Sequence, residues 1–326
     1  MHQLFRRIIL ALFLLFTGQF VMALPSDFVV ASDGSGNFTS IQKAIDACKA
    51  FPDHRIVIFV KNGTYKEKLV IPSCNTQLLI VGESVEKTII TYDDYFDKVN
   101  RGRNSTFYTY TMKVEANDFR LENITVENTA GAVGQAVALH VEGDRCVFFN
   151  CRILGNQDTI YAAGRFSRQY FKNCYIEGTT DFIFGEATSV FENCSIHCKS
   201  DSYITAASTS EGKLFGFVFL NCKITAAEGV GKVYLGRPWR IYAKTAFLNC
   251  EMGAFISPEG WHNWSKPESE KKAVYAEYNN TGEGALNSRR VLWSVKLSKK
   301  EACFFTREKI FAPLEQEKIL GSKWYE

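Results

Sequence analysis

The chain has 326 residues, of which 46% are hydrophobic and 22% charged, and it contains only 7 prolines. This composition is typical of one folded domain and argues against long disordered segments. The 38 Lys and Arg residues nearly balance the 35 Asp and Glu residues, which disfavours a nucleic-acid-binding protein, since such a protein shows a clustered basic excess.

The first residues have the pattern of a secretory signal peptide. Arg6 and Arg7 precede an apolar run over 8–16, and Val21-Met22-Ala23 is typical of a cleavage site. The run is shorter than the roughly 20 apolar residues of a membrane-spanning helix, so a membrane anchor is the weaker alternative. We predict a signal peptide over 1–23 and one domain over 24–326. Removing the peptide lowers the basic count from 38 to 36, against 35 acidic residues.

A secreted chain can carry N-linked sugars and disulfides. Asn123 and Asn193 begin Asn-x-Ser/Thr triplets but lie in predicted coils, so we interpret them as chance matches. The other candidate triplets begin at Asn37, Asn62, Asn104, Asn263 and Asn279. Disulfides are plausible among the cysteines outside the repeat described below, with a connectivity that spacing does not fix: Cys48, Cys74, Cys146, Cys198 and Cys303.

A short amphipathic helix is predicted near the start of the domain, over residues 39–49. Ile41, Ala44 and Ile45 recur at helical spacing, and Thr39 or Ser40 supplies an N-cap. The helix would cover the open end of a stack of strands, which is otherwise an unpaired edge. Strand-like segments follow over 55–60, 68–71, 77–81, 119–126 and 136–141, and the polar stretch over 91–106 is interpreted as a loop.

A repeated phrase defines the middle of the chain. Residues 151–158 and 174–181 both read C-x-I-x-G-x-x-D, with an offset of 23 at every matched position. An aromatic-x-Asn-Cys phrase extends the repeat, and its cysteines are Cys151, Cys174, Cys194, Cys222 and Cys250, spaced 23, 20, 28 and 28 residues apart. Such periods with short β-rich segments indicate a solenoid, and the leucine spacing of a leucine-rich horseshoe is missing. We predict an all-β fold, a single-domain right-handed parallel β-helix.

Stacked coils place equivalent residues in ladders about 4.8 Å apart. The five repeat cysteines are predicted to form an inward ladder of small apolar side chains. A zinc site is disfavoured, because no second pair of ligands accompanies Cys194 and Cys198 at the required spacing. The last strand signal covers 290–295, and residues 299–320 are predicted to form a helical tail that packs along the solenoid.

The repeat brings two carboxylates together. Asp158 and Asp181 occupy the same repeat position, so they should lie side by side on neighbouring coils. Acid–base catalysis and covalent ester or glycoside chemistry use such pairs. Asp201 has the same offset from Cys194 without chemical neighbours, and it represents the alternative interpretation of a solvated turn residue.

Amide and guanidinium groups are predicted around this pair. A further step of 23 residues back reaches Gln135, so Gln135, Asp158 and Asp181 are predicted to form a column across three coils, although no cysteine precedes Gln135 at the repeat offset. Gln157 offers a second amide donor, and Arg237 would hold a nearby carboxylate ionised. The complete set favours a catalytic site far more than either aspartate alone.

Five motifs resemble, in order, the signature motifs of plant pectinesterases (pectin methylesterases). They are residues 33–39 (DGSGNFT), 134–139 (GQAVAL), 155–161 (GNQDTIY), 181–185 (DFIFG) and 235–239 (LGRPW). Residues 278–293 resemble the family's C-terminal coil, so the resemblance runs from about residue 28 to 293. The form that it indicates lacks the inhibitor-like pro-region. A slightly longer turn over 162–167 departs from the family pattern and affects the expected cleft rim.

The resemblance implies hydrolysis of the C6 methyl ester of galacturonate in pectin, with release of methanol. It implies Asp181 as the nucleophile that forms an acyl-enzyme, and Asp158 as the proton donor that later acts as base. Gln157 and Gln135 would stabilise the oxyanion of the transition state, and Arg237 would orient Asp181 and contact substrate. No metal or cofactor is required.

The resemblance also implies a sugar-binding groove lined by aromatic side chains. Trp239, Tyr161, Phe184 and Trp261 would stack on sugar rings, with ordinary packing as the alternative interpretation. The implied partner is methylesterified homogalacturonan, and a proteinaceous pectinesterase inhibitor is a further expected partner. We expect a secreted, glycosylated monomer of the plant cell wall, without nucleic acid or a membrane span.

Other enzyme classes fit the residues less well. A polysaccharide lyase would need a calcium cluster of several acids and a Lys or Arg base. A galacturonan hydrolase also uses two carboxylates, and only the glutamines favour an ester. A serine esterase is disfavoured because no G-x-S-x-G motif is present. A non-catalytic pectin-binding protein should have lost one of the catalytic residues, and all are present.

Overall fold

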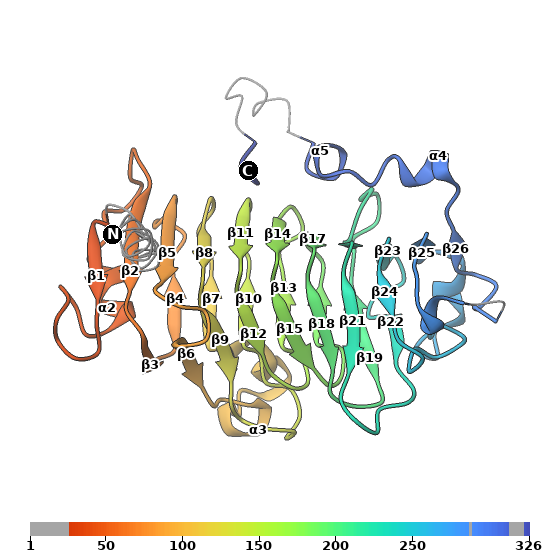
Figure 1. Cartoon of the computed structure of the whole chain (residues 1–326), viewed down its shortest axis with the longest axis horizontal. Coiled ribbons are helices and arrows are strands. Elements are labelled where there is room, and N and C mark those ends of the chain that lie inside the picture. Colours follow the sequence, from red (N-terminus) through yellow and green to blue (C-terminus); the bar gives the residue numbers. More distant parts are fainter. Residues whose placement is uncertain (1–25, 287–288, 313–322) are drawn as a thin grey trace, which may run out of the picture.

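The computed structural model describes residues 26–286, 289–312 and 323–326. Three parallel sheets run the length of the molecule and form a right-handed parallel β-helix, as predicted (Figure 1). Successive strands of one coil enter the three sheets in turn, so each strand pairs with its equivalent one coil before and one coil after. The predicted signal peptide lies outside the described residues.

Among the described residues, the largest sheet, sheet A, has 11 strands. They are β1 (Phe28–Val30), β2 (Ile56–Val60), β5 (Leu78–Gly82), β8 (Arg120–Glu122), β11 (Cys146–Phe149), β14 (Arg168–Lys172), β17 (Thr188–Glu192), β20 (Phe217–Leu220), β23 (Lys244–Leu248), β25 (Val274–Tyr278) and β26 (Val295–Lys296).

In the part of the chain that the structure describes, sheet B has 8 strands and sheet C has 7. Sheet B contains β3 (Gly63–Lys66), β6 (Thr88–Tyr92), β9 (Thr125–Asn128), β12 (Arg152–Leu154), β15 (Tyr175–Gly178), β18 (Ser195–Cys198), β21 (Lys223–Ala226) and β24 (Glu251–Met252). Sheet C contains β4 (Leu69–Ile71), β7 (Met112–Val114), β10 (Leu139–Val141), β13 (Ile160–Ala162), β16 (Ile183–Gly185), β19 (Tyr203–Ala207) and β22 (Tyr234–Pro238).

The predicted N-terminal helix is present as α2 (Ile41–Asp46), shorter than the 39–49 expected. Ser40 is its N-cap, and the Ser40 hydroxyl accepts a hydrogen bond from the Lys43 N–H. The apolar side chains Ile41, Ala44 and Ile45 are fully buried. The helix contacts β1 and β4 at the first end of the solenoid, so it covers the edge that the coils leave open there (Figure 1).

The interior consists of ladders of identical side chains. Phe148, Phe171, Phe191, Phe219 and Phe247 stack ring on ring, with centroids 4.3–4.7 Å apart. The predicted cysteine ladder lies beside them, and its members are at most 2% exposed. All ten cysteines of the chain are free thiols, so the disulfides considered from the sequence are not formed. Each ladder thiol instead donates to a backbone carbonyl oxygen of the preceding coil, as from Cys222 to Phe191 at 3.3 Å.

The recurrent asparagine of the repeat has a backbone explanation. Asn150, Asn173, Asn193, Asn221 and Asn249 all have φ between 50° and 55°. They form the turn from sheet A into sheet B, where the chain must adopt a left-handed conformation that asparagine tolerates better than most residues. The asparagine therefore marks the same corner on each of these coils.

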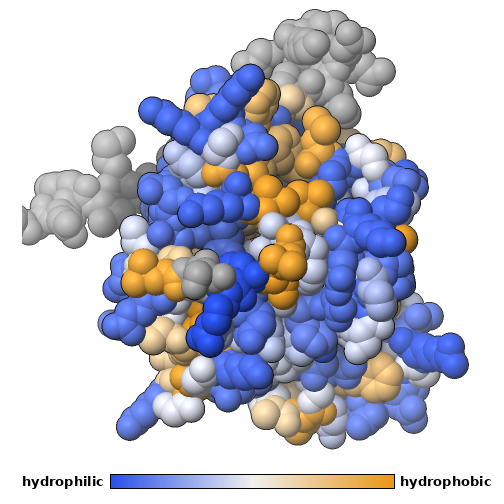
Figure 2. Space-filling model, turned by 90° about the vertical axis from the view of Figure 1, so that its right-hand side faces the viewer, coloured by the Kyte–Doolittle hydropathy of each residue, from blue (hydrophilic) through white to orange (hydrophobic). Residues whose placement is uncertain are grey.

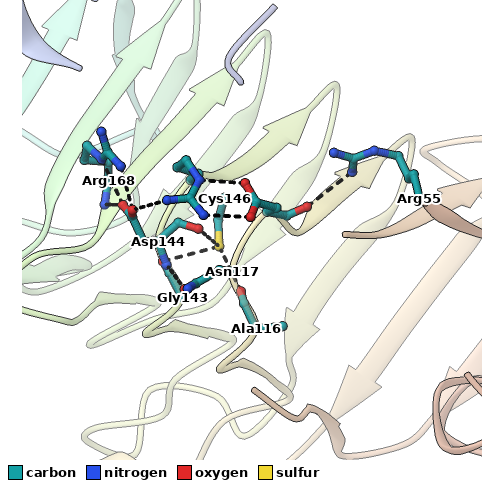
Figure 3. Close-up of polar contacts among 9 residues, drawn as sticks. Arg55, Ala116, Asn117, Gly143, Asp144, Cys146 and Arg168 are labelled. Carbon is teal, nitrogen blue, oxygen red and sulfur yellow. Dashed lines mark hydrogen bonds and ion pairs between the residues drawn. The ribbon is translucent and has the colours of Figure 1, made fainter. Parts of the chain in front are cut away.

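An ion-pair chain ties coils together at the opposite turn, from sheet C into sheet A (Figure 3). Arg145 donates twice to the Asp118 carboxylate, at 2.6 and 2.7 Å, and also contacts Asp144 at 3.0 Å. Asp144 accepts from Arg168 of the next coil at 2.7 Å, and Arg55 donates to the Asp118 carbonyl oxygen. These alternating charges fix the register of neighbouring coils that precede Asp181 in the chain.

Two expectations about irregular segments are corrected. The stretch 91–106 was expected to be a loop, but it contains α3 (Phe96–Val99) and most of the 3-10 helix η1 (Gly102–Tyr108). The expected helical tail over 299–320 is, in its described part, two short helices, α4 (Lys299–Ala302) and α5 (Arg307–Ile310). Residues 313–320 of that prediction lie outside the described residues.

The tail packs on the outer face of sheet A, as predicted. Phe311 packs against Tyr170 with ring centroids 5.9 Å apart, and Tyr325 approaches the same ring at 6.5 Å. Two further 3-10 helices, η2 (Pro267–Lys271) and η3 (Glu283–Ala285), lie near the C-terminal end. Figure 2 faces that end, where apolar side chains lie between hydrophilic ones. Among the described residues, no helix is long and apolar enough to cross a membrane.

Candidate active site

The predicted catalytic residues gather at the outer face of sheet C. Asp158 and Asp181 stand two residues before β13 and β16, and these strands pair in parallel with Ile160 opposite Ile183. The register therefore places the two aspartates at equivalent positions on adjacent coils. Both have positive φ, 66° for Asp158 and 49° for Asp181, a conformation that aspartate tolerates better than most residues.

Arg237 of β22 binds the Asp181 carboxylate in a two-pronged ion pair. The Arg237 Nε donates to Asp181 Oδ1 at 2.9 Å, and Nη2 donates to Oδ2 at 2.6 Å. The side chain of Asp181 is only 7% exposed and that of Arg237 is 18% exposed. Arg237 reaches across the coil of β19, where Ala206 is its register partner and has too short a side chain to fill the outer face.

Two aromatic rings enclose the guanidinium group of Arg237. Its Cζ lies 4.0 Å from the centroid of the Tyr203 ring and 3.7 Å from that of the Trp264 ring. Stacking on aromatic faces is favourable for a guanidinium group and restricts its orientation. The aromatic contacts and the ion pair together hold the guanidinium group of Arg237 against the Asp181 carboxylate.

The two carboxyl groups have different electrostatic surroundings. Burial raises the pKa of Asp158 well above 3.8, and the neighbouring Asp181 charge raises it further. Burial also raises the pKa of Asp181, but hydrogen bonds and charge from Arg237 oppose this effect. Within the described residues, the Asp158 side chain has no hydrogen-bond partner. The environment thus favours a protonated Asp158 beside an ionised Asp181.

Gln135 does not complete the column predicted from the 23-residue step. It pairs with Gln157, at an offset of 22, so it lies opposite Gln157 and not opposite Asp158. The Ala136 N–H donates to the Gln157 carbonyl oxygen at 3.1 Å and fixes this register. Neither glutamine amide group bonds to another described residue, so both remain available to a ligand next to Asp158.

An aromatic cluster lies beside the carboxylates. Tyr161 and Phe184 stack with centroids 4.7 Å apart, and the ring of Trp239 stands edge-on to both, 6.5 Å and 5.8 Å away. Phe107 contacts Tyr161 from the 3-10 helix η1 at 5.0 Å. Phe184 is 5% exposed, so it supports the floor of the site, whereas Tyr161 and Trp239 are partly exposed. A surface hollow of about 580 Å³ continues past Trp239.

The prediction for Trp261 is wrong. Its side chain is 1% exposed and stacks on Tyr275 in the core with centroids 4.3 Å apart, so a sugar ring cannot reach it. The tryptophan that reaches the site is Trp264, which the sequence analysis missed. The spacing of three between Trp261 and Trp264 was visible, but only the left-handed backbone at Trp264, with φ of 54°, turns the second ring outward.

The chain is similar to proteins of one known family. Residues 27–313 match the family model described as Pectinesterase. Pectinesterase 31 of Arabidopsis thaliana is 41% identical over 89% of this chain and 93% of its own length. Pectinesterase 4 of the same plant is 38% identical, and the match covers 89% of this chain but 51% of that protein.

Solved structures show the same architecture. The pectin methylesterase from carrot matches with a TM-score of 0.83 and 35% identity, covering 89% of this chain and 94% of that one. The pectin methylesterase from Aspergillus niger matches with a TM-score of 0.76 and 31% identity, covering 93% and 96% of the two chains.

Proposed function

Since this chain belongs to the pectinesterase family and is a carboxylic ester hydrolase that demethylesterifies pectin, we propose that Asp158 and Asp181 carry out the hydrolysis. The observation that supports the roles is the asymmetry of the pair: Arg237 donates hydrogen bonds to the Asp181 carboxylate and none to Asp158. Two adjacent acids whose surroundings push their pKa values apart serve as separate acid and nucleophile.

In the first half of the reaction, the ionised Asp181 attacks the carbonyl carbon of the C6 methyl ester. The C–O bond to the methoxy group breaks as Asp158 transfers its proton to that oxygen, and methanol leaves. The galacturonyl group is then held on Asp181 as an acyl-enzyme. The amides of Gln135 and Gln157 donate to the oxyanion of the tetrahedral intermediate, a role that their unengaged side chains next to Asp158 support.

In the second half, Asp158 is ionised and acts as base. It removes a proton from a water molecule, whose oxygen attacks the acyl carbon and breaks its bond to Asp181. The products are a free galacturonic acid group, an ionised Asp181 and a protonated Asp158, so the site returns to its starting state. The galacturonic acid group then releases its proton to water. Arg237 keeps Asp181 charged and aimed before the attack, and it stabilises the Asp181 carboxylate as that group leaves in the second half.

The polymer is proposed to lie over the aromatic cluster. Tyr161, Trp239 and Trp264 would present ring faces and edges to sugar rings, with Phe184 packed beneath them. The proposed setting is secretion to the plant cell wall as a glycosylated monomer, a proposal supported by the N-terminal sequence pattern. A proteinaceous inhibitor is a further proposed partner, because some relatives are described as pectinesterase/pectinesterase inhibitor proteins.

Methanol release from highly methylated pectin tests the assignment. Wild-type protein should release methanol without new reducing ends or unsaturated products, while Asp158→Ala and Asp181→Ala should release almost none. Asp201→Ala is the matched control, because Asp201 has the same repeat offset but is exposed and accepts from two backbone N–H groups. Methanol release by folded Asp181→Ala would refute the nucleophile, and chain cleavage by wild type would favour a lyase or hydrolase.

A further inference from the structure

His262 lies behind the active site without a role in the proposed reaction. Its backbone N–H donates to the Gly236 carbonyl oxygen at 3.1 Å, which attaches the segment after β24 to the edge of β22. Its ring stands 5.6 Å from both Tyr203 and Tyr234, which stack on each other at 5.3 Å. The histidine is therefore in contact with the aromatic support of Arg237.

The polar contact of His262 points to Trp264. The Nδ1 atom accepts a hydrogen bond from the Trp264 backbone N–H at 2.9 Å. Trp264 and Ser265 both have φ of 54°, and a non-glycine residue in the left-handed region costs on the order of 1–2 kcal/mol. Such a conformation persists only when its surroundings hold it. Asn263 holds Ser265 in the same way, because its Oδ1 accepts from the Ser265 N–H at 2.9 Å.

We propose that His262 is a positioning residue: its neutral imidazole holds Trp264 over Arg237 and so keeps Arg237 on Asp181. A ring protonated at Nδ1 cannot accept the Trp264 N–H. Protonation therefore releases the Trp264 backbone and loosens the aromatic contact, 3.7 Å from the guanidinium group, that restricts Arg237. The consequence for catalysis rests on the proposed roles of Arg237 and Asp181.

The charges around His262 favour the neutral ring. Lys232 and Arg237 are the charged groups that act on it, and Tyr203 and Tyr234 are the titratable groups packed against its ring. Burial, then the charge of Arg237 and that of Lys232, lowers the pKa of His262 below 6.5. We call the hydrogen bond from the Trp264 N–H to His262 Nδ1 the clamp. It is thus formed at neutral pH and is lost only in acid.

Two substitutions separate the acceptor from its titration. His262→Asn keeps a side-chain oxygen that can accept the N–H two residues on, as Asn263 does, but does not titrate. His262→Leu removes the acceptor. We expect His262→Asn to retain wild-type kcat at pH 7 and to keep activity at pH values where wild type loses it. His262→Leu should lose about 3- to 10-fold in kcat at pH 7, the worth of one hydrogen bond.

Activity and fluorescence give distinguishable outcomes. The proposal is overturned if His262→Leu matches wild type in kcat and pH profile, or if His262→Asn keeps the wild-type acid limb. Emission from Trp264, obtained as the difference from Trp264→Phe, should change between pH 7 and pH 4.5 in wild type but not in His262→Asn. That readout needs no turnover, so an inactive wild type would refute the proposed function while the Trp264 emission still tests the clamp.

Discussion

Replacing Asp158 by asparagine is expected to stabilise the fold at neutral pH while abolishing methanol release. Asp158 is 8% exposed, and burial together with the charge of Asp181 raises its pKa. An acid whose pKa is raised by folding binds its proton more tightly in the folded state. The free energy of unfolding of wild type therefore falls as pH rises from the unfolded value, near 3.9, through the folded one. Asparagine lacks this titration.

The size of the effect follows from the geometry of adjacent coils. Linkage to one proton changes the free energy of unfolding by at most about 1.4 kcal/mol per pH unit. Two unit charges one strand spacing apart, about 4.8 Å, repel by roughly 3 kcal/mol at an effective dielectric constant of 20. The stability gained by Asp158→Asn should therefore be smallest at pH 4 and should grow by up to roughly 3 kcal/mol as the wild-type carboxyl ionises.

Urea denaturation of both proteins between pH 4 and pH 8 measures this difference. Asp201→Asn is a control with the opposite sign: backbone N–H groups of Lys232 and Gly231 lower the pKa of Asp201, so its contribution to stability is present above the unfolded pKa and is lost as pH falls. A difference between Asp158→Asn and wild type that is independent of pH, or that shrinks as pH rises, would refute the reasoning.

Three further outcomes follow from the same structure. Arg237→Lys replaces a two-pronged donor by a point charge, so kcat/KM for methanol release should fall about 10- to 100-fold, whereas a change under 2-fold would contradict the ion pair's role. Trp261→Ala should lower the free energy of unfolding, measured by urea denaturation, by about 3–5 kcal/mol because it empties a core position. Trp239→Ala should leave that free energy nearly unchanged and raise KM for pectin. Equal losses of stability in the two variants would contradict this division. Asn221→Ala should lower the free energy of unfolding by about 1–2 kcal/mol, because alanine tolerates a φ of 53° poorly. Asn221→Gly should be more stable than Asn221→Ala and recover most of this loss. Equal stabilities of the two variants would argue against backbone strain.

The sequence allowed the fold and the carboxylate pair to be predicted because a parallel solenoid converts a repeat offset directly into register. The step of 23 residues that separates Cys151 from Cys174 also separates Asp158 from Asp181, and strand pairing preserves it. The same step failed for Gln135, because the preceding coil is one residue shorter there and pairs Gln135 with Gln157. Turn length, which the repeat does not determine, decides such positions.

The other differences between the sequence-based predictions and the structure depend on backbone conformation and long-range packing. Nothing in the spacing of Trp261 and Trp264 shows which ring points inward, since the left-handed residues at 264 and 265 make that choice. The helices α3 and η1 formed in a stretch whose polarity indicated a loop. The packing of η1 against the aromatic cluster, through Phe107 on Tyr161, is a long-range contact that no local pattern reports.

The free thiols of the cysteine ladder have a consequence for how the molecule is built during synthesis. No disulfide joins the cysteines of this chain, so no coil has to wait for an oxidation step or for a distant partner. The coils pair only with their neighbours in sequence, and α2 already closes the end that leaves the ribosome first. At about 5–20 residues per second, each coil can dock on a finished template within seconds. The carboxylate pair is then in place before Arg237 emerges, and the active site is completed only when the coil of β22 has stacked.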